Sequence, residues 1–119
     1  MNTLENARRG EIWQADLGAG HSMLVLVVST NALSSLPLRL VAPLQPWDDR
    51  FAKMIWIQRL EGNWPTQLGA PHAVDLLQLR SIELTCFRKR IGRVPAVKMD
   101  EIAAAIALVV DFQVPNAPV

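Results

Sequence analysis

The stretch LVLVVST, from Leu24 to Thr30, decides the fold of this chain. It is rich in β-branched residues and apolar at successive positions, which is the pattern of a strand buried on both faces. The continuous apolar run, residues 23–28, is far shorter than the roughly 20 residues that a membrane-spanning helix needs. We therefore expect a central strand of a sheet and no membrane segment.

Short strands separated by turn residues surround this central strand. Alternating or continuous apolar patterns predict strands over residues 11–17, 38–44, 53–60, 72–82 and 91–94. The first of them is followed by a Gly18-Ala19-Gly20 turn. Pro43 should place its strand at an edge or at a strand end, and a slip in the apolar phase at Leu76-Leu77 predicts a bulge or a sharp bend.

One helix is predicted near the C-terminus. Met99, Ile102 and Ile106 recur at helical spacing, and the helix should run to about Phe112. Asp100 and Glu101 should lie in its first turn, and residues 83–90 should form a short helical turn before the last strand. Five or six short strands with one helix predict a mainly β fold, a small antiparallel barrel with a C-terminal α-helix.

Length and composition limit the function classes. A chain of 119 residues makes one domain, and 12 basic against 11 acidic residues give a net charge of +1. This balance lacks the marked basic excess of most nucleic-acid-binding domains. The single Cys86 excludes an internal disulfide, and no Cys/His spacing suggests zinc. Because 50% of the residues are hydrophobic, a partner or a second copy should cover part of the surface.

Three stretches carry a resemblance to a known family. They are RRGEIWQADL (8–17), LVLVVSTN (24–31), and QLRSI (78–82) followed by RIGRV (90–94) and the final helix. On these residues the chain resembles the MazF/PemK toxins, the endoribonuclease components of bacterial toxin–antitoxin pairs. The resemblance implies one domain over residues 1–119, an SH3-like barrel and helix over residues 8–112, and loose termini at 1–7 and 113–119. Without the resemblance, the sequence itself predicts a longer loose N-terminal arm, over the first nine residues.

The resemblance also implies partners and chemistry. It implies a cytoplasmic homodimer that binds single-stranded RNA in a groove across the dimer, and an antitoxin protein that occupies this groove. It implies RNA cleavage with no metal and no cofactor. Such cleavage needs proton transfer to and from the reacting oxygens and a group that neutralises the charge on the phosphorus.

The chain departs from the family at the residues that carry this chemistry. The family's second strand opens with an Arg-Pro pair whose Arg is held to be catalytic, and here those positions are Met23 and Leu24. The Thr that usually follows the third strand is Gln45, and the acid that often precedes the Gln of the fifth strand is Leu77. The resemblance therefore carries over the fold but not the active site, and the sequence leaves open whether the chain is an enzyme.

Six residues are candidates for the site. We predict His21 and Gln45 as catalytic residues, because histidine exchanges protons readily near neutral pH and glutamine donates hydrogen bonds. We predict Ser22, Gln78, Arg80 and Trp47 as RNA-binding residues. Several have a structural alternative: an exposed loop position for His21, a turn residue for Gln45, and an ion pair or a backbone hydrogen bond inside the barrel wall for Gln78 and Arg80. Trp47 and Trp64, on predicted loops, fit a dimer mate or a protein partner as readily as RNA.

Two functions therefore remain open at this point. The first is the toxin of a toxin–antitoxin pair, a metal-independent and sequence-specific endoribonuclease acting on single-stranded RNA. The second is a catalytically inactive protein of the MazF fold that binds an antitoxin-like peptide, a protein or a nucleic acid.

Overall fold

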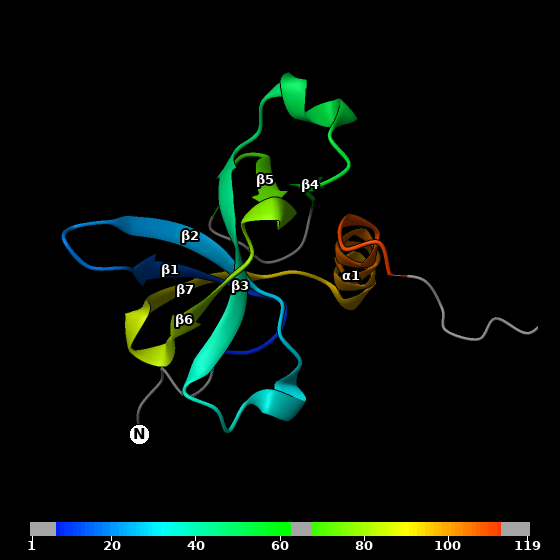
Figure 1. Cartoon of the computed structure of the whole chain (residues 1–119). Coiled ribbons are helices and arrows are strands. Elements are labelled where there is room, and N and C mark those ends of the chain that lie inside the picture. Colours follow the sequence, from blue (N-terminus) through cyan, green and yellow to red (C-terminus); the bar gives the residue numbers. More distant parts are fainter. Residues whose placement is uncertain (1–6, 63–67, 113–119) are drawn as a thin grey trace, which may run out of the picture.

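A computed structural model of the chain describes residues 7–62 and 68–112, which form one antiparallel sheet and one α-helix (Figure 1). The predicted loose termini, except Ala7, and Trp64 lie outside these residues. The strands are β1 (Glu11–Asp16), β2 (Ser22–Val27), β3 (Leu38–Pro46), β4 (Ile57–Leu60), β5 (His72–Asp75), β6 (Arg80–Glu83) and β7 (Phe87–Arg93). The helix is α1 (Ala96–Val109), and four short 3-10 helices are η2 (Asn31–Leu33), η3 (Asp49–Lys53), η4 (Leu76–Gln78) and η5 (Leu84–Cys86).

The strands follow the order β4-β5-β3-β2-β1-β7, and β6 pairs with the first half of β3. This confirms the mainly β fold with a C-terminal helix. The sheet is not a closed barrel, because β6 and β7 do not pair with each other. The predicted central strand is confirmed as β2, which pairs with β1 and β3 and buries Val25, Leu26 and Val27 completely.

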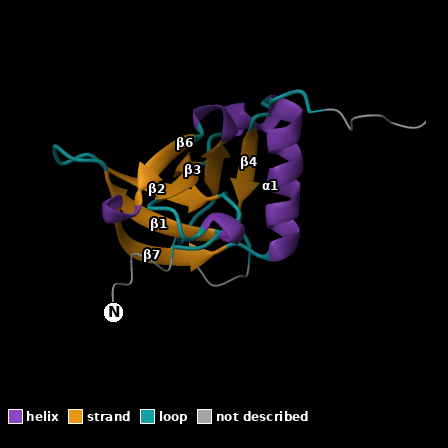
Figure 2. Cartoon of the chain, turned by 60° about the horizontal axis from the view of Figure 1, so that its bottom comes forward, coloured by secondary structure: helices purple, strands orange, loops and turns teal. Residues whose placement is uncertain are grey.

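The curled sheet has an apolar cluster on each face, because successive side chains of a strand point to opposite sides. On one face, Ile12 and Leu26 lie opposite each other and pack with Met99 and Ile102 of α1. Figure 2 shows α1 lying along one side of the sheet. On the other face, the cluster around Trp13 includes residues of both β6 and β7, so the curl of the sheet encloses it.

Pro43 lies inside β3, so its predicted place at an edge or a strand end is wrong. One side of β3 pairs with β2, and there Pro43 is opposite Val25. The other side pairs with β6 up to Val41 and with β5 from Leu44 onward. Proline has no N–H to donate, and Pro43 occupies the interval between these two partners. The helix η4 joins β5 to β6 across this interval, so the bend predicted at Leu76-Leu77 is confirmed.

Other element boundaries differ from the sequence prediction. The fourth strand begins at Ile57 because Lys53 ends the 3-10 helix η3, whose first turn is capped by Asp48. The helical turn predicted over 83–90 covers only Leu84–Cys86, and β7 follows at once. The helix α1 begins at Ala96, after Pro95, so Asp100 and Glu101 lie beyond its first turn.

The beginning of the described chain is fixed by a buried arginine. The Arg39 side chain donates hydrogen bonds to four backbone carbonyls: Nε to Ala7 (2.8 Å), Nη1 to Leu36 and Leu38 (2.9 Å each), and Nη2 to Ser34 (3.1 Å). Burial, together with the charge of Arg8, lowers the pKa of Arg39. Ala7 is fully buried, so the loose arm predicted over the first nine residues is wrong from Ala7 onward.

Candidate active site

A small hollow lies where the start of β2, the end of β3 and η4 meet. Its volume is about 190 Å³. The residues that line it are Met23, Pro43, Leu44, Gln45, Asp75 and Gln78. It opens beside the interval of β3 that lacks a strand partner, so the break in the sheet provides the space.

Asp75 is the only ionisable side chain among the described residues that line this hollow. Its residue is 7% exposed, and its two carboxylate oxygens accept hydrogen bonds from two neutral donors. Gln78 Nε2 donates to Oδ2 at 2.7 Å, and the Leu77 backbone N–H donates to Oδ1 at 3.0 Å. These bonds close the first turn of η4 and fix the amide of Gln78. Sequence analysis missed Asp75; the available signal was an acid that ends the apolar run of β5.

Two of the six predicted site residues, Gln45 and Gln78, line the hollow. Gln45 comes from β3, opposite Ala73 of β5, and Gln78 ends η4. Both side chains are exposed, so their amide groups are accessible to a ligand. From β2 the hollow receives the thioether of Met23, which supplies neither a charge nor a hydrogen-bond donor.

His21 and Ser22 lie next to the hollow along the chain, but they do not line it. The β1–β2 turn closes with hydrogen bonds from the His21 N–H to the Gly18 carbonyl and from the Leu17 N–H to the His21 carbonyl, each 2.8 Å. Gly18 and Gly20 take positive φ values of 95° and 74° in the predicted turn. This hairpin projects from the body of the sheet (Figure 1), and His21 is exposed in its turn. Ser22 Oγ accepts a hydrogen bond from Gln14 Nε2 at 3.1 Å.

A family model described as PemK-like, MazF-like toxin of type II toxin–antitoxin systems matches residues 8–110, which include every residue that lines the hollow. The chain belongs to this MazF/PemK family. Endoribonuclease MazF9 of Mycobacterium tuberculosis (strain ATCC 25618 / H37Rv) is 31% identical over 114 residues, which cover 88% of this chain and 97% of that protein.

Solved structures with the same fold are also known. An endoribonuclease in complex with its cognate antitoxin from Mycobacterial species has a TM-score of 0.75 at 18% identity, covering 91% of this chain and 98% of its own. Mycobacterium tuberculosis toxin MazF-mt6 has a TM-score of 0.72 at 19% identity, with 87% and 99% covered. MazE–MazF from Deinococcus radiodurans gives 0.70 at 17%, with 89% and 96% covered. At these identities the comparison establishes the MazF fold.

Arg80 is not part of the hollow in this MazF-family chain. It begins β6 opposite Val41, four positions along β3 from Gln45. The side chain is exposed and makes no ion pair within residues 7–62 and 68–112. The structural alternative, an ion pair or a backbone hydrogen bond inside the barrel wall, is therefore wrong for this exposed side chain, which makes neither among the residues that the structure describes.

Trp47 follows Gln45 by two residues and belongs to a small aromatic and charged cluster. The guanidinium of Arg59 lies 4.8 Å from the Trp47 ring, and Phe51 meets the ring edge-on at 5.8 Å. Trp47 Nε1 donates to Asp49 at 3.2 Å. Next to it, the hydrogen bond from Arg50 lowers the pKa of Asp48. The indole is thus held in place and half-buried, two residues along the chain from Gln45.

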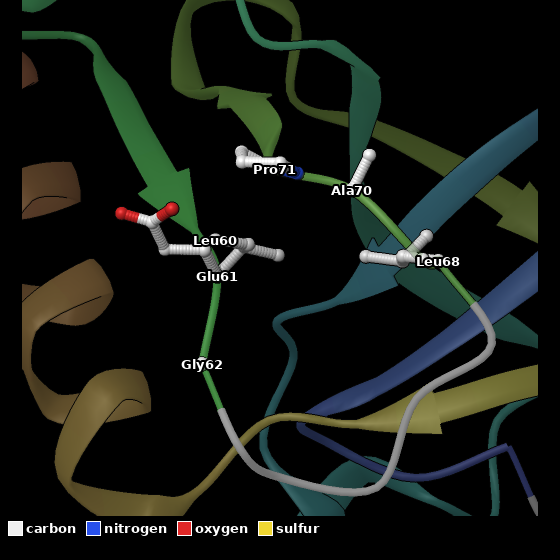
Figure 3. Close-up of a pocket in the computed structure, with 7 residues that line it drawn as sticks. Leu60, Glu61, Gly62, Leu68, Ala70 and Pro71 are labelled. Carbon is white, nitrogen blue, oxygen red and sulfur yellow. The ribbon is translucent and has the colours of Figure 1, made fainter.

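A second hollow, of about 350 Å³, lies between the end of β4 and the start of β5 (Figure 3). Glu61 is the only charged side chain among the described residues that line it, and its carboxylate points away from Leu68 and Ala70 in this view. Glu61 also pairs with Arg59 at 3.0 Å. It therefore lacks the convergent polar groups of the first hollow. The described part of the chain holds no cluster of three or more His, Cys, Asp or Glu that would bind a metal, and no helix able to cross a membrane.

Proposed function

We propose that this MazF-family chain is the toxin of a toxin–antitoxin pair and an endoribonuclease that cuts single-stranded RNA. The observation that carries the proposal is the 31% identity to Endoribonuclease MazF9 over nearly the full length of both chains. The hollow between β2, β3 and η4 supports it, because Gln45 keeps a hydrogen-bonding side chain at the position of the family's Thr. The alternative, a protein of the same fold that binds without cutting, is less well supported because this relative is an endoribonuclease.

Each candidate residue has a proposed role in RNA cleavage. Gln45 and Gln78 donate amide N–H groups to the phosphate, and Gln78 has one N–H left after it donates to Asp75. An amide cannot release a proton at neutral pH, so the proton for the leaving oxygen comes from His21 in the adjoining hairpin. Ser22, Arg80 and Trp47 bind the RNA on either side of the cut, Trp47 by stacking on an unpaired base.

We infer that the toxin acts in the cytoplasm as a homodimer and that an antitoxin covers its site. The solved structure of the same fold in complex with its cognate antitoxin supports the proposed antitoxin. The apolar side chains left exposed at the end of α1, Leu108, Val110 and Phe112, support contact with a second chain.

The test is cleavage of a long mixed-sequence RNA by the purified protein in the presence of EDTA. We expect cuts at a short consensus, and a rate about 100-fold lower for His21→Ala, at the lower end of general acid–base effects. The matched control is His72→Ala, because the His72 ring contacts the Ala70 carbonyl and lines no part of the hollow. A folded wild-type dimer that leaves the RNA intact overturns the proposed function. Unchanged cleavage by His21→Ala removes only the role of His21.

A further inference from the structure

The proposed site needs a group that takes a proton from the attacking hydroxyl. Neither glutamine can accept a proton, and Met23 cannot either. Of the described residues that line the hollow, Asp75 alone has an ionisable side chain. We propose that Asp75 is the general base of this site and removes the proton from the ribose 2′-hydroxyl. This inference rests on the proposed function.

The geometry holds the Asp75 carboxylate ready for this role. Asp75 ends β5 and caps η4, so its backbone is fixed by the sheet on one side and by the turn on the other. The bonds from Leu77 and Gln78 use one lone pair on each carboxylate oxygen. The remaining lone pairs are available to a hydroxyl group that enters the hollow. A base whose side chain is already fixed loses little conformational entropy when the substrate binds.

The reaction balances with the residues named. The 2′-oxygen gives its proton to an Asp75 oxygen and forms a bond to phosphorus. The bond from phosphorus to the 5′-oxygen breaks, and that oxygen keeps the electron pair and takes a proton from His21. The charge that builds on the non-bridging oxygens is stabilised by the amide N–H groups of Gln45 and Gln78. The products are a 2′,3′-cyclic phosphate and a 5′-hydroxyl end, and solvent restores both proton carriers.

The charge of Asp75 distinguishes this role from RNA binding. A carboxylate close to a phosphate weakens binding by like-charge repulsion. If Asp75 only bound RNA, its removal would weaken binding. If it is the base, its removal slows the chemical step and leaves RNA affinity unchanged or stronger.

The test uses Asp75→Asn and Asp75→Ser, with Asp100→Asn on the exposed side of α1 as the matched control. Asparagine keeps the shape of the Asp75 side chain. Its oxygen still accepts the hydrogen bond from the Leu77 N–H, and its NH₂ donates to the Gln78 oxygen after the Gln78 amide rotates by about 180°. Serine keeps an acceptor for the Leu77 N–H. We expect both variants to lose at least about 100-fold in the single-turnover cleavage rate, with an unchanged or smaller Kd for RNA. Thermal unfolding verifies that each variant is folded.

A second substrate separates the base from the acid. When sulfur replaces the bridging 5′-oxygen, the leaving group needs no proton, so His21→Ala should recover its rate whereas the Asp75 variants should not. If the wild type cleaves RNA and the Asp75 variants cleave within about threefold of its rate, the inference is overturned and the proposed function stands. Recovery of the Asp75 variants on the sulfur substrate also overturns the inference. Absence of cleavage by the wild type overturns the proposed function, and the inference fails with it.

Discussion

Arg39→Met is expected to lower the free energy of unfolding by about 3 kcal/mol, because four backbone carbonyls lose their shared donor. The buried bond to Ala7 accounts for about 1.5 kcal/mol, and the three partly buried bonds, which water can replace, for about 0.5 kcal/mol each. The carbonyl of Ala7 is 32 residues away from Arg39 along the chain, so the substitution also releases the first described segment from β3. Methionine retains much of the apolar length of the side chain. The loss therefore reports the hydrogen bonds rather than a cavity.

Urea unfolding followed by tryptophan fluorescence measures this effect. The matched control is Arg50→Met, since the Arg50 side chain is 80% exposed and pairs only with the neighbouring Asp48. An exposed pair of this kind contributes little, about 1 kcal/mol or less. Equal stability of the two variants would contradict the role assigned to Arg39.

Phe87→Ala is expected to lower the free energy of unfolding by about 3–5 kcal/mol, the usual range for a large aromatic residue removed from a core. Phe87 is fully buried and meets the Trp13 ring edge-on at 5.6 Å. It joins β7 to the cluster inside the curled sheet, on the side where β6 and β7 lack hydrogen bonds to each other. The chain joins β6 to β7 there through η5, but no strand pairing does, so the loss of this ring has no compensation from backbone pairing.

Ile55→Ala is the matched control for this prediction, because Ile55 is 60% exposed. Its removal should change the stability by no more than about 0.5 kcal/mol. Thermal unfolding monitored by circular dichroism compares the two variants. A Phe87→Ala protein as stable as Ile55→Ala would show that the interior cluster does not hold β6 and β7 in place.

The sequence predicted the structural elements that are determined by residues close together in the chain. The double-sided apolar run became β2, the Gly-rich turn after β1 formed, and the phase slip at Leu76-Leu77 became η4. The place of Pro43 was wrong because it depends on two other strands. Nothing near Pro43 in the sequence shows that β6 and β5 leave an interval beside it.

The site was predicted in part, for the same reason. Gln45 and Gln78 were found through the family pattern, and both line the hollow. Asp75 was missed because its place in the same hollow as Gln45 depends on how β5 and η4 pack against β3, which the local sequence does not show. The roles of His21, Ser22, Arg80 and Trp47 stay predictions: none of them lines the hollow, and each lies on a neighbouring segment that RNA would have to reach.

The interval beside Pro43 has a consequence for how this toxin could diversify. The space is made by backbone, through a proline that cannot donate and a 3-10 turn that carries the chain past it. The side chains at its rim, Gln45 and Gln78, are exposed, and Met23 is only half-buried. Changes at Gln45 and Gln78 therefore alter the chemistry offered to a substrate without touching the apolar clusters on the two faces of the sheet, whereas Met23 also packs against the cluster around Trp13. Gln45 and Gln78 can therefore be replaced by other reactive residues while the protein stays folded.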